Sequence, residues 1–223
     1  MKRFLIVSIL VLTTVSINAQ GVSPYSMRNI KFGIELNSDI WLNMPDTVKL
    51  KTINRGVNLY LMYQYKFKES NFGISAGLSV ATQNMYLKNS YLHTSNGISE
   101  FQKFPADNTF KKNKLNLNFI ELPLEINYIT KSLINFALGG KIGYLISDKT
   151  KYKGKEYTGD NSTEIKKKVH NNQNISDYRI GAYALVGYKW MNLTVYYGFT
   201  KLFEKDKGPE ISPLTVGIMI RPY

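Results

Sequence analysis

The feature that most constrains this chain is a regular alternation of apolar with polar or small residues, which returns in eight segments after residue 28. A period of two is typical of β-strands with one apolar face. In the fourth segment the apolar residues change from odd to even positions, so we expect a β-bulge near Ile120 and Glu121. The segments cover residues 30–36, 57–67, 72–80, 115–128, 134–144, 178–190, 193–199 and 214–220.

The connections between these segments alternate between long and short. Long connections are expected at 43–56, 87–114, 147–176 and 201–212, and tight turns at 68–71, 130–132 and 191–192. An even-numbered barrel with both termini at its short-turn end gives this pattern, with short periplasmic turns and long external loops. The pattern predicts an all-β fold, a transmembrane eight-stranded antiparallel up-and-down β-barrel.

The two faces of the predicted strands differ in composition. One face carries Gly, Ser, Asn, Thr and charged residues, and the other is almost wholly Leu, Ile, Val, Phe and Tyr. Eight strands leave an interior that side chains just fill, and small polar residues fit it better than large apolar ones. We therefore expect the apolar face to contact lipid. A soluble, lipocalin-like barrel that turns this face inward around a ligand is the alternative.

The first 19 residues have the pattern of a secretory signal peptide. Lys2 and Arg3 precede an apolar run from Phe4 to about Val15, and Ala19 suits signal peptidase. The run is shorter than the roughly 20 residues that a membrane-spanning helix needs. We expect a mature barrel domain over residues 20–223, and a retained N-terminal anchor is the alternative.

Aromatic residues gather near both ends of the predicted strands. Trp and Tyr favour membrane–water interfaces, so these rings predict two aromatic girdles on the outer face. Ordinary strand propensity is the alternative explanation. The candidate girdle residues are Tyr63, Tyr65, Phe67, Phe72, Tyr86, Tyr128, Tyr144, Tyr178, Tyr188, Trp190 and Phe199.

Side chains of a β-strand point alternately to its two faces, so the odd or even position of a residue, its strand parity, tells which face it is on. Strand parity places a set of charged residues inside the barrel. Six are basic and five are acidic, which suits a lumen where charges must be paired to offset desolvation. We expect a structural ion-pair network, with a proton or ion relay through Glu121 and Glu125 as the alternative, and no water-filled pore. The candidate residues are Lys31, Glu35, Asp39, Lys66, Glu121, Glu125, Lys141, Asp177, Arg179, Lys189 and Arg221.

The formal net charge is +13, and its excess lies mainly in the long connections. The third connection is a basic loop that carries Lys149, Lys151, Lys153, Lys155, Lys166, Lys167 and Lys168. Outer-membrane lipid, lipopolysaccharide phosphates and acidic sugars are the expected partners of such lysines, with other envelope proteins also considered. A solvated, self-repelling loop is the alternative. No nucleic-acid-binding module accompanies the charge.

The sequence lacks the residues of most catalytic and metal sites. It has no cysteine and only two histidines, His93 and His170, both in long connections. We therefore expect a non-enzymatic monomer with no catalytic residues, cofactor or metal. A lipid-modifying outer-membrane enzyme is the alternative, and it predicts that one histidine lies beside a serine and a carboxylate at the barrel rim.

The segment Phe119-Ile120-Glu121-Leu122-Pro123-Leu124-Glu125-Ile126-Asn127-Tyr128 resembles a strand of the PorT-like outer-membrane β-barrel family. As in that family, it follows the long second external connection and precedes a short turn and a Gly-rich strand. The resemblance spans most of residues 21–223 and implies an outer-membrane location and an eight-stranded barrel. For some members it also implies a part in protein secretion.

Overall fold

The computed structural model describes residues 29–106, 108–156 and 163–222. The expected signal peptide at residues 1–19 lies outside the described residues. Lys31–Tyr223 forms one compact unit. Among the described residues, no helix is long and apolar enough to span a membrane.

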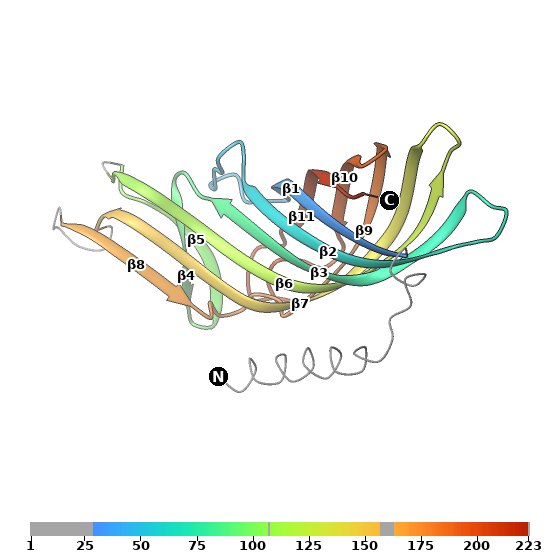
Figure 1. Ribbon diagram of the computed structural model, residues 1–223. Coiled ribbons are helices and arrows are strands. Elements are labelled where there is room, and N and C mark those ends of the chain that lie inside the picture. The colour runs from blue at the N-terminus through green and yellow to red at the C-terminus, as the bar shows by residue number, and fades with distance from the viewer. Residues whose placement is uncertain (1–28, 107, 157–162, 223) are drawn as a thin grey trace, which may run out of the picture. The chain divides into compact units, whose positions relative to one another are not determined.

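Eight antiparallel strands form a closed barrel (Figure 1). Each pairs with its neighbour in the chain, β6 pairs with β7, and β1 pairs with β11 to close the ring. This confirms the predicted up-and-down topology. The strands are β1 (Ile30–Leu42), β2 (Arg55–Lys66), β3 (Phe72–Tyr86), β6 (Phe110–Ile129), β7 (Ile134–Lys155), β9 (Tyr178–Tyr188), β10 (Met191–Gly198) and β11 (Ser212–Ile220).

Three further strands occupy the segments that we expected to be loops. In the second connection, β4 (Ser90–Ser95) and β5 (Ile98–Lys103) form a hairpin. Its two-residue turn is Asn96-Gly97, with φ of 51° and 76°, which suits a tight hairpin. In the third connection, β7 runs on to Lys155, and β8 (Glu164–His170) pairs with it. The segments 87–114 and 147–176, which we expected to be long loops, are therefore largely strand.

The outer face of the barrel carries the apolar side chains. Leu138 is 67% exposed and Leu193 is 61% exposed, whereas their neighbours Ala137 and Thr194 are 6% and 7% exposed. The same alternation runs along every barrel strand. In water such a surface would be strongly unfavourable, so this belt is the surface that the bilayer covers.

The change of apolar parity in β6 does not come from a bulge at Ile120 and Glu121, as we expected. Leu115, Leu117 and Phe119 point inward and are at most 4% exposed, and the parity of β6 continues unbroken past them. The register shift at this level lies between Asn118 and Phe119, and the extra residue belongs to β7. The apolar residues change faces because the strand leaves the membrane zone, and its apolar face then packs inward as in a water-soluble domain.

The inward residues at the long-loop end form a continuous apolar cluster. It joins β1, β3, β6 and β7 to residues of the connecting loops, and Trp41 packs in it with its ring 5.6 Å from that of Phe101. Trp41 thus faces inward near the rim, as strand parity predicts. Its buried members are Trp41, Val48, Ala81, Met85, Leu87, Leu115, Leu117, Phe119, Leu145, Ile175, Leu202, Phe203 and Ile211.

The short turns lie close to their expected positions. The turn between β9 and β10 consists of Lys189 and Trp190, and not of Met191 and Asn192 as we expected. Lys189 has a φ of 51° and its amide donates a hydrogen bond to the Leu133 carbonyl (2.9 Å). This contact ties two neighbouring short turns together.

Candidate functional site

A buried ion-pair cluster centred on Glu121 crosses the middle of the lumen. Arg179 donates a hydrogen bond to the Glu121 carboxylate from Nε (2.8 Å), and its Nη2 forms an ion pair with the same carboxylate at 2.5 Å. Lys141 Nζ lies 3.9 Å from the same carboxylate, and Ser79 donates to it at 3.0 Å. All of these side chains are buried, and the Arg179 guanidinium also lies 4.0 Å from the centre of the Phe119 ring. The cluster links β3, β6, β7 and β9 across the barrel.

The other buried acids have partners of their own. Glu125 accepts hydrogen bonds from Arg221 (2.8 Å) and from the Tyr183 hydroxyl (2.6 Å). Asp39 accepts from Gln83 (2.9 Å) and Thr215 (2.7 Å).

Glu35 accepts from Asn58 (3.1 Å) and Thr194 (2.8 Å), and also from the Tyr60 hydroxyl. Lys141 donates to the same hydroxyl at 2.6 Å. Tyr60 therefore connects the Glu35 group to the cluster around Glu121.

Three of the charged residues that parity placed inside are not in this network. Lys66, Asp177 and Lys189 are all exposed, because they lie at strand ends or in a turn, where the barrel opens to solvent. Lys31 is half-buried, and with Arg221 it lines a small pocket at the short-turn end. Lys31 and the three exposed residues are therefore not buried as we expected, whereas Arg221 pairs with the buried Glu125 at 2.8 Å.

All eleven candidate girdle residues lie on the outer surface, at least partly exposed. Toward the short-turn end, Phe72 and Tyr128 stack with ring centres 4.7 Å apart. Toward the long-loop end, Tyr144 and Tyr178 lie 5.2 Å apart. Tyr86 differs from the others because the ammonium groups of two lysines lie over its ring, at 5.6 Å and 5.7 Å.

The predicted basic loop is a three-stranded sheet made by the long-loop ends of β6, β7 and β8. Its outer face presents two cross-strand rows of lysines, paired in register. One row is Lys112, Lys153 and Lys166, and the next is Lys114, Lys151 and Lys168. With Lys149 and Lys155 from the same face of β7, these residues are the basic face. Lys167 points to the opposite side of β8.

The lysines of the basic face perturb one another. The positive charge of Lys112, and after it of Lys168, lowers the pKa of Lys151. Burial lowers the pKa of Lys114 to about 8, with Lys112 and Lys151 adding to the shift. Like charges directly opposite on neighbouring strands destabilise a sheet. The face therefore carries a positive charge that a bound anion would relieve.

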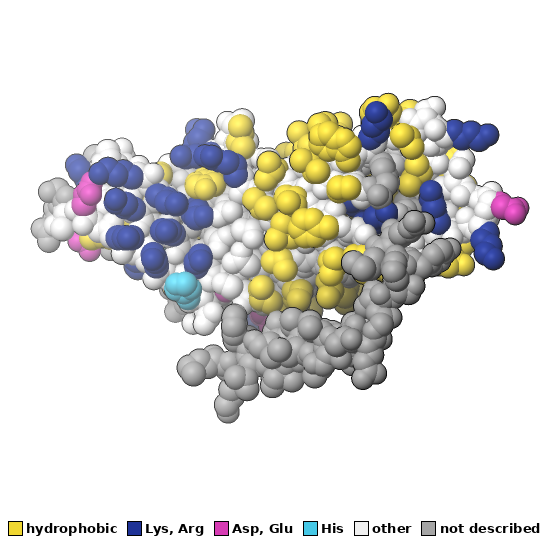
Figure 2. Space-filling model, viewed as in Figure 1, with side chains coloured by type: hydrophobic (Ala, Val, Ile, Leu, Met, Phe, Trp, Pro, Cys, Tyr) yellow, Lys and Arg dark blue, Asp and Glu magenta, His cyan; other side chains and the backbone are white. Residues whose placement is uncertain are grey.

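Few acidic groups offset this charge. Of the described residues on this face only Glu164 is acidic, and it pairs with Lys111 at 3.0 Å. Figure 2 shows Lys and Arg side chains gathered at the end where β6, β7 and β8 extend, beside the hydrophobic band across the middle of the strands. On β7 the apolar belt ends at Ile146, which is 48% exposed, and Lys149 follows three residues later. The basic face thus continues the lipid-facing surface of the barrel.

The basic face includes Lys112 and Lys114, which the sequence analysis did not select. Both lie in a segment that we expected to be a loop. Their alternation, Lys112 and Lys114 separated by Asn113, is itself a period-two pattern that would have placed both on one side of a strand.

The two histidines lie on different strands, β4 and β8. His93 is on β4, with its ring 6.3 Å from that of Tyr91 and opposite Glu100 on β5, whose carboxylate accepts from Gln102 at 2.8 Å. His170 ends β8 opposite Lys149. Among the described residues, no group of three His, Cys, Asp or Glu side chains could hold a metal ion.

Comparisons with known proteins place the chain. No curated protein sequence matches it. Similar solved structures include Ail, the attachment invasion locus protein of Yersinia pestis, in complex with the heparin analogue sucrose octasulfate: 15% identity, TM-score 0.36, 86% of this chain and 96% of that one. The structure of Ail in a phospholipid bilayer nanodisc is 13% identical in sequence with a TM-score of 0.37, and the match covers 86% of this chain and 98% of that one. A mutant of the Rh. blastica porin is 9% identical with a TM-score of 0.22, and the match covers 86% of this chain and 99% of that one.

A family model described as an outer membrane protein beta-barrel domain matches residues 9–204, which is most of the chain. The match agrees with the closed eight-stranded barrel and its apolar outer belt. The chain therefore belongs to the outer membrane protein β-barrel domain family and is a protein of the bacterial outer membrane.

Proposed function

We propose that this protein is a non-enzymatic, monomeric barrel that binds anionic groups at the cell surface through its basic face. The ligands are the phosphates and acidic sugars of lipopolysaccharide in the surrounding outer leaflet. The filled lumen serves as a rigid support, and the basic face carries the binding.

The observation that carries this proposal is the pair of in-register lysine rows. An isolated loop can separate its charges by moving, whereas β6, β7 and β8 fix theirs on neighbouring strands. Such strands lie about 4.8 Å apart. Because the face lies directly above the apolar belt, the nearest anions are those of the lipid headgroups in the same membrane. Each lysine near an anionic surface contributes about 1 kcal/mol.

The test measures binding of a fluorescent, phosphorylated lipopolysaccharide core oligosaccharide to the barrel folded in zwitterionic micelles. A triple variant, Lys112→Gln, Lys153→Gln and Lys166→Gln, removes one whole row. This variant is expected to lose about 3 kcal/mol of binding free energy, which raises its Kd roughly a hundredfold. The barrel should fold at least as well as before, because the substitutions remove like-charge repulsion.

A matched control removes three lysines at the same, long-loop end of the barrel that lie off this face. Lys88, Lys103 and Lys205 are exposed and belong to the second and fourth connections. Their triple change to Gln lowers the net charge equally and should alter the Kd by less than about threefold. Equal losses in the two variants, or no binding by the unaltered protein, would contradict the proposal.

A part in protein secretion is a second candidate function, and it has one specific observation in its favour. The segment from Phe119 to Tyr128 resembles the PorT-like group, some of whose members take part in secretion. The segment also holds Glu121 and Glu125, two of the buried acids of the lumen. Deletion of the gene in its host, followed by measurement of secreted protein, tests this role. Unchanged secretion would exclude it.

We also propose that residues 1–19 are a cleaved signal, so that the mature chain begins at Gln20. Mass spectrometry of the protein from outer membranes tests this directly. An N-terminal peptide that starts at Gln20 supports cleavage, and one that still contains Lys2 and Arg3 would mean a retained anchor.

A further inference from the structure

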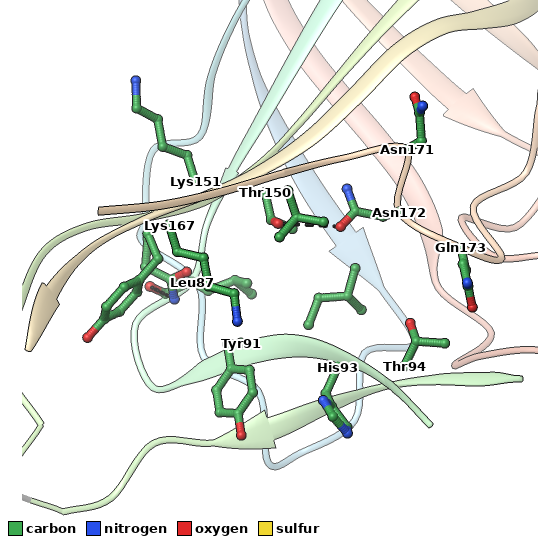
Figure 3. A pocket seen from close by; sticks show the side chains of 14 residues that line it. Leu87, Tyr91, His93, Thr94, Thr150, Lys151, Lys167, Asn171, Asn172 and Gln173 are labelled. Carbon is green, nitrogen blue, oxygen red and sulfur yellow. Dashed lines mark hydrogen bonds between the residues drawn. The ribbon is translucent and has the colours of Figure 1, made fainter. Parts of the chain in front are cut away.

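A cleft of about 410 Å³ lies between β4 and the inner side of the β7–β8 sheet, opposite the basic face (Figure 3). Its volume is within the range of small-molecule sites, about 300–1,000 Å³. It is separate from the lumen network, and it lies on the other side of the β7–β8 sheet from the proposed anion-binding surface, with Lys151 as a shared residue. The side chains of β8 alternate between the two, because Lys166 and Lys168 belong to the basic face while Lys167 lines the cleft.

The cleft combines three kinds of wall. Its apolar part comes from Leu87, Leu92 and Val169. Figure 3 shows Lys167 extending from β8 toward Tyr91 on β4, so that one edge carries an ammonium group beside an aromatic ring. Amide and hydroxyl groups line the rest, chiefly those of Thr94, Thr150, Asn172 and Gln173.

Hydrogen bonds fix several of these walls. Asp148, which is 7% exposed, accepts from the backbone amide of Asn172 (2.7 Å) and from its side-chain amide (2.6 Å). Thr150 donates to Asn172 Oδ1 at 3.3 Å. On the opposite wall, the Tyr91 hydroxyl donates to Gln102 at 2.9 Å. The cleft is therefore shaped before any ligand enters, which lowers the entropic cost of binding.

The charge of the cleft selects among ligands. None of the 14 residues that line it is acidic, and Figure 3 shows the Lys167 side chain extending toward Tyr91 while that of Lys151 extends away from the cleft. A cationic ligand would be repelled by Lys167, and a purely apolar one would make no use of the hydrogen-bonding groups of the cleft. A ligand that carries hydroxyl groups, one anionic group and an apolar ring face meets all three walls.

We propose that this cleft binds an acidic sugar residue of a cell-surface polysaccharide. The sugar carboxylate pairs with the Lys167 ammonium, its hydroxyl groups exchange hydrogen bonds with Asn172, Gln173 and Thr94, and its C–H face lies against Val169 and Leu92. The site goes beyond the proposed function, since the cleft would recognise the shape of one sugar, whereas the basic face would bind anions by their charge.

The experiment titrates the barrel in zwitterionic micelles with a fluorescent galacturonic acid trisaccharide and with the corresponding neutral galactose trisaccharide. Lys167→Gln should weaken binding of the acidic probe at least about tenfold, the loss of a hydrogen bond to a charged group. Lys205→Gln is the matched control, because it removes the same charge from an exposed lysine of the fourth connection that belongs neither to the cleft nor to the basic face. It should leave the Kd within about twofold.

A second variant keeps the proposal testable if Lys167→Gln disturbs the strand. Val169→Phe fills the cleft without changing its charge and should abolish binding of the acidic probe, while the heat-induced gel shift of a folded barrel is retained. Equal effects of Lys205→Gln and Lys167→Gln, equal affinity for the neutral probe, or full binding by Val169→Phe would each overturn the proposal. The triple row variant of the basic face should still bind this probe, so the two proposals fail independently.

Discussion

Replacing Glu121 by glutamine removes one negative charge from the centre of the barrel and keeps the size of the side chain. Glu121 is 1% exposed, accepts a hydrogen bond from Arg179 Nε at 2.8 Å and forms ion pairs with Arg179 Nη2 at 2.5 Å and Lys141 Nζ at 3.9 Å. Removal of one partner from a buried pair costs about 3–5 kcal/mol, because the remaining charge is left uncompensated. We expect the Glu121→Gln variant to lose about that much stability.

The assay is urea unfolding of the barrel in phospholipid vesicles, followed by tryptophan fluorescence. Glu204→Gln is the control, since Glu204 pairs with Lys207 at 2.6 Å on the surface, where both side chains are about half exposed. Such surface pairs contribute about 0–1 kcal/mol. A double variant, Glu121→Leu with Arg179→Met, should recover part of the loss. If Glu121→Gln were no less stable than Glu204→Gln, the lumen network would not be the support that we describe.

Three further predictions concern other parts of the chain. Binding of the phosphorylated oligosaccharide should weaken as the pH rises through about 8, because Lys114, whose pKa is lowered to about 8, then loses its charge. The Lys114→Gln variant should lack this step in a pH titration of binding. Gly139→Ala should lower the free energy of unfolding in urea by about 1–3 kcal/mol, since a Cβ there would lie 2.2 Å from the Leu124 carbonyl oxygen. Gly140→Ala should be tolerated, because the atom nearest to its Cβ would be 3.6 Å away. Leu117→Ala should cost about 2–5 kcal/mol and Leu122→Ala, which faces lipid, much less; equal values would contradict the inward packing of Leu117.

The strand pattern predicted the barrel because each barrel strand faces two different environments. Where lipid lies on one side and the filled lumen on the other, apolar and polar residues must alternate, as Leu193 and Thr194 do. Beyond the membrane this rule ends. Leu115 and Leu117 are apolar and point inward there, so their parity suggested a bulge that β6 does not have.

The candidate site was predicted in composition but not in shape. The sequence identified the lysines of β7 and β8, yet a run such as Lys166, Lys167 and Lys168 does not tell which strand it pairs with. Register depends on the partner strand, and here it brings residues that are far apart in the chain, such as Lys112 and Lys166, into one row. The Asn96-Gly97 turn was a local signal for the β4–β5 hairpin that we did not use.

The charged lumen was predicted where parity and position along the strand agree. Glu121, Glu125 and Arg179 lie at mid-barrel depth and are buried. Lys66 and Asp177 lie at the strand ends and are exposed, because the ends of a barrel open to water whichever way a side chain points. Parity alone gives the face of a residue but not its depth.

The central claim is that the apolar face of this barrel contacts lipid. The chain has no cysteine, so a single one can be introduced and labelled with a fluorophore. At Leu138→Cys, in the middle of the belt, brominated phospholipids should quench the label strongly, while at Lys103→Cys on β5 they should not. Absence of quenching at position 138, with the protein found in the soluble periplasm, would contradict the account and turn the apolar face inward.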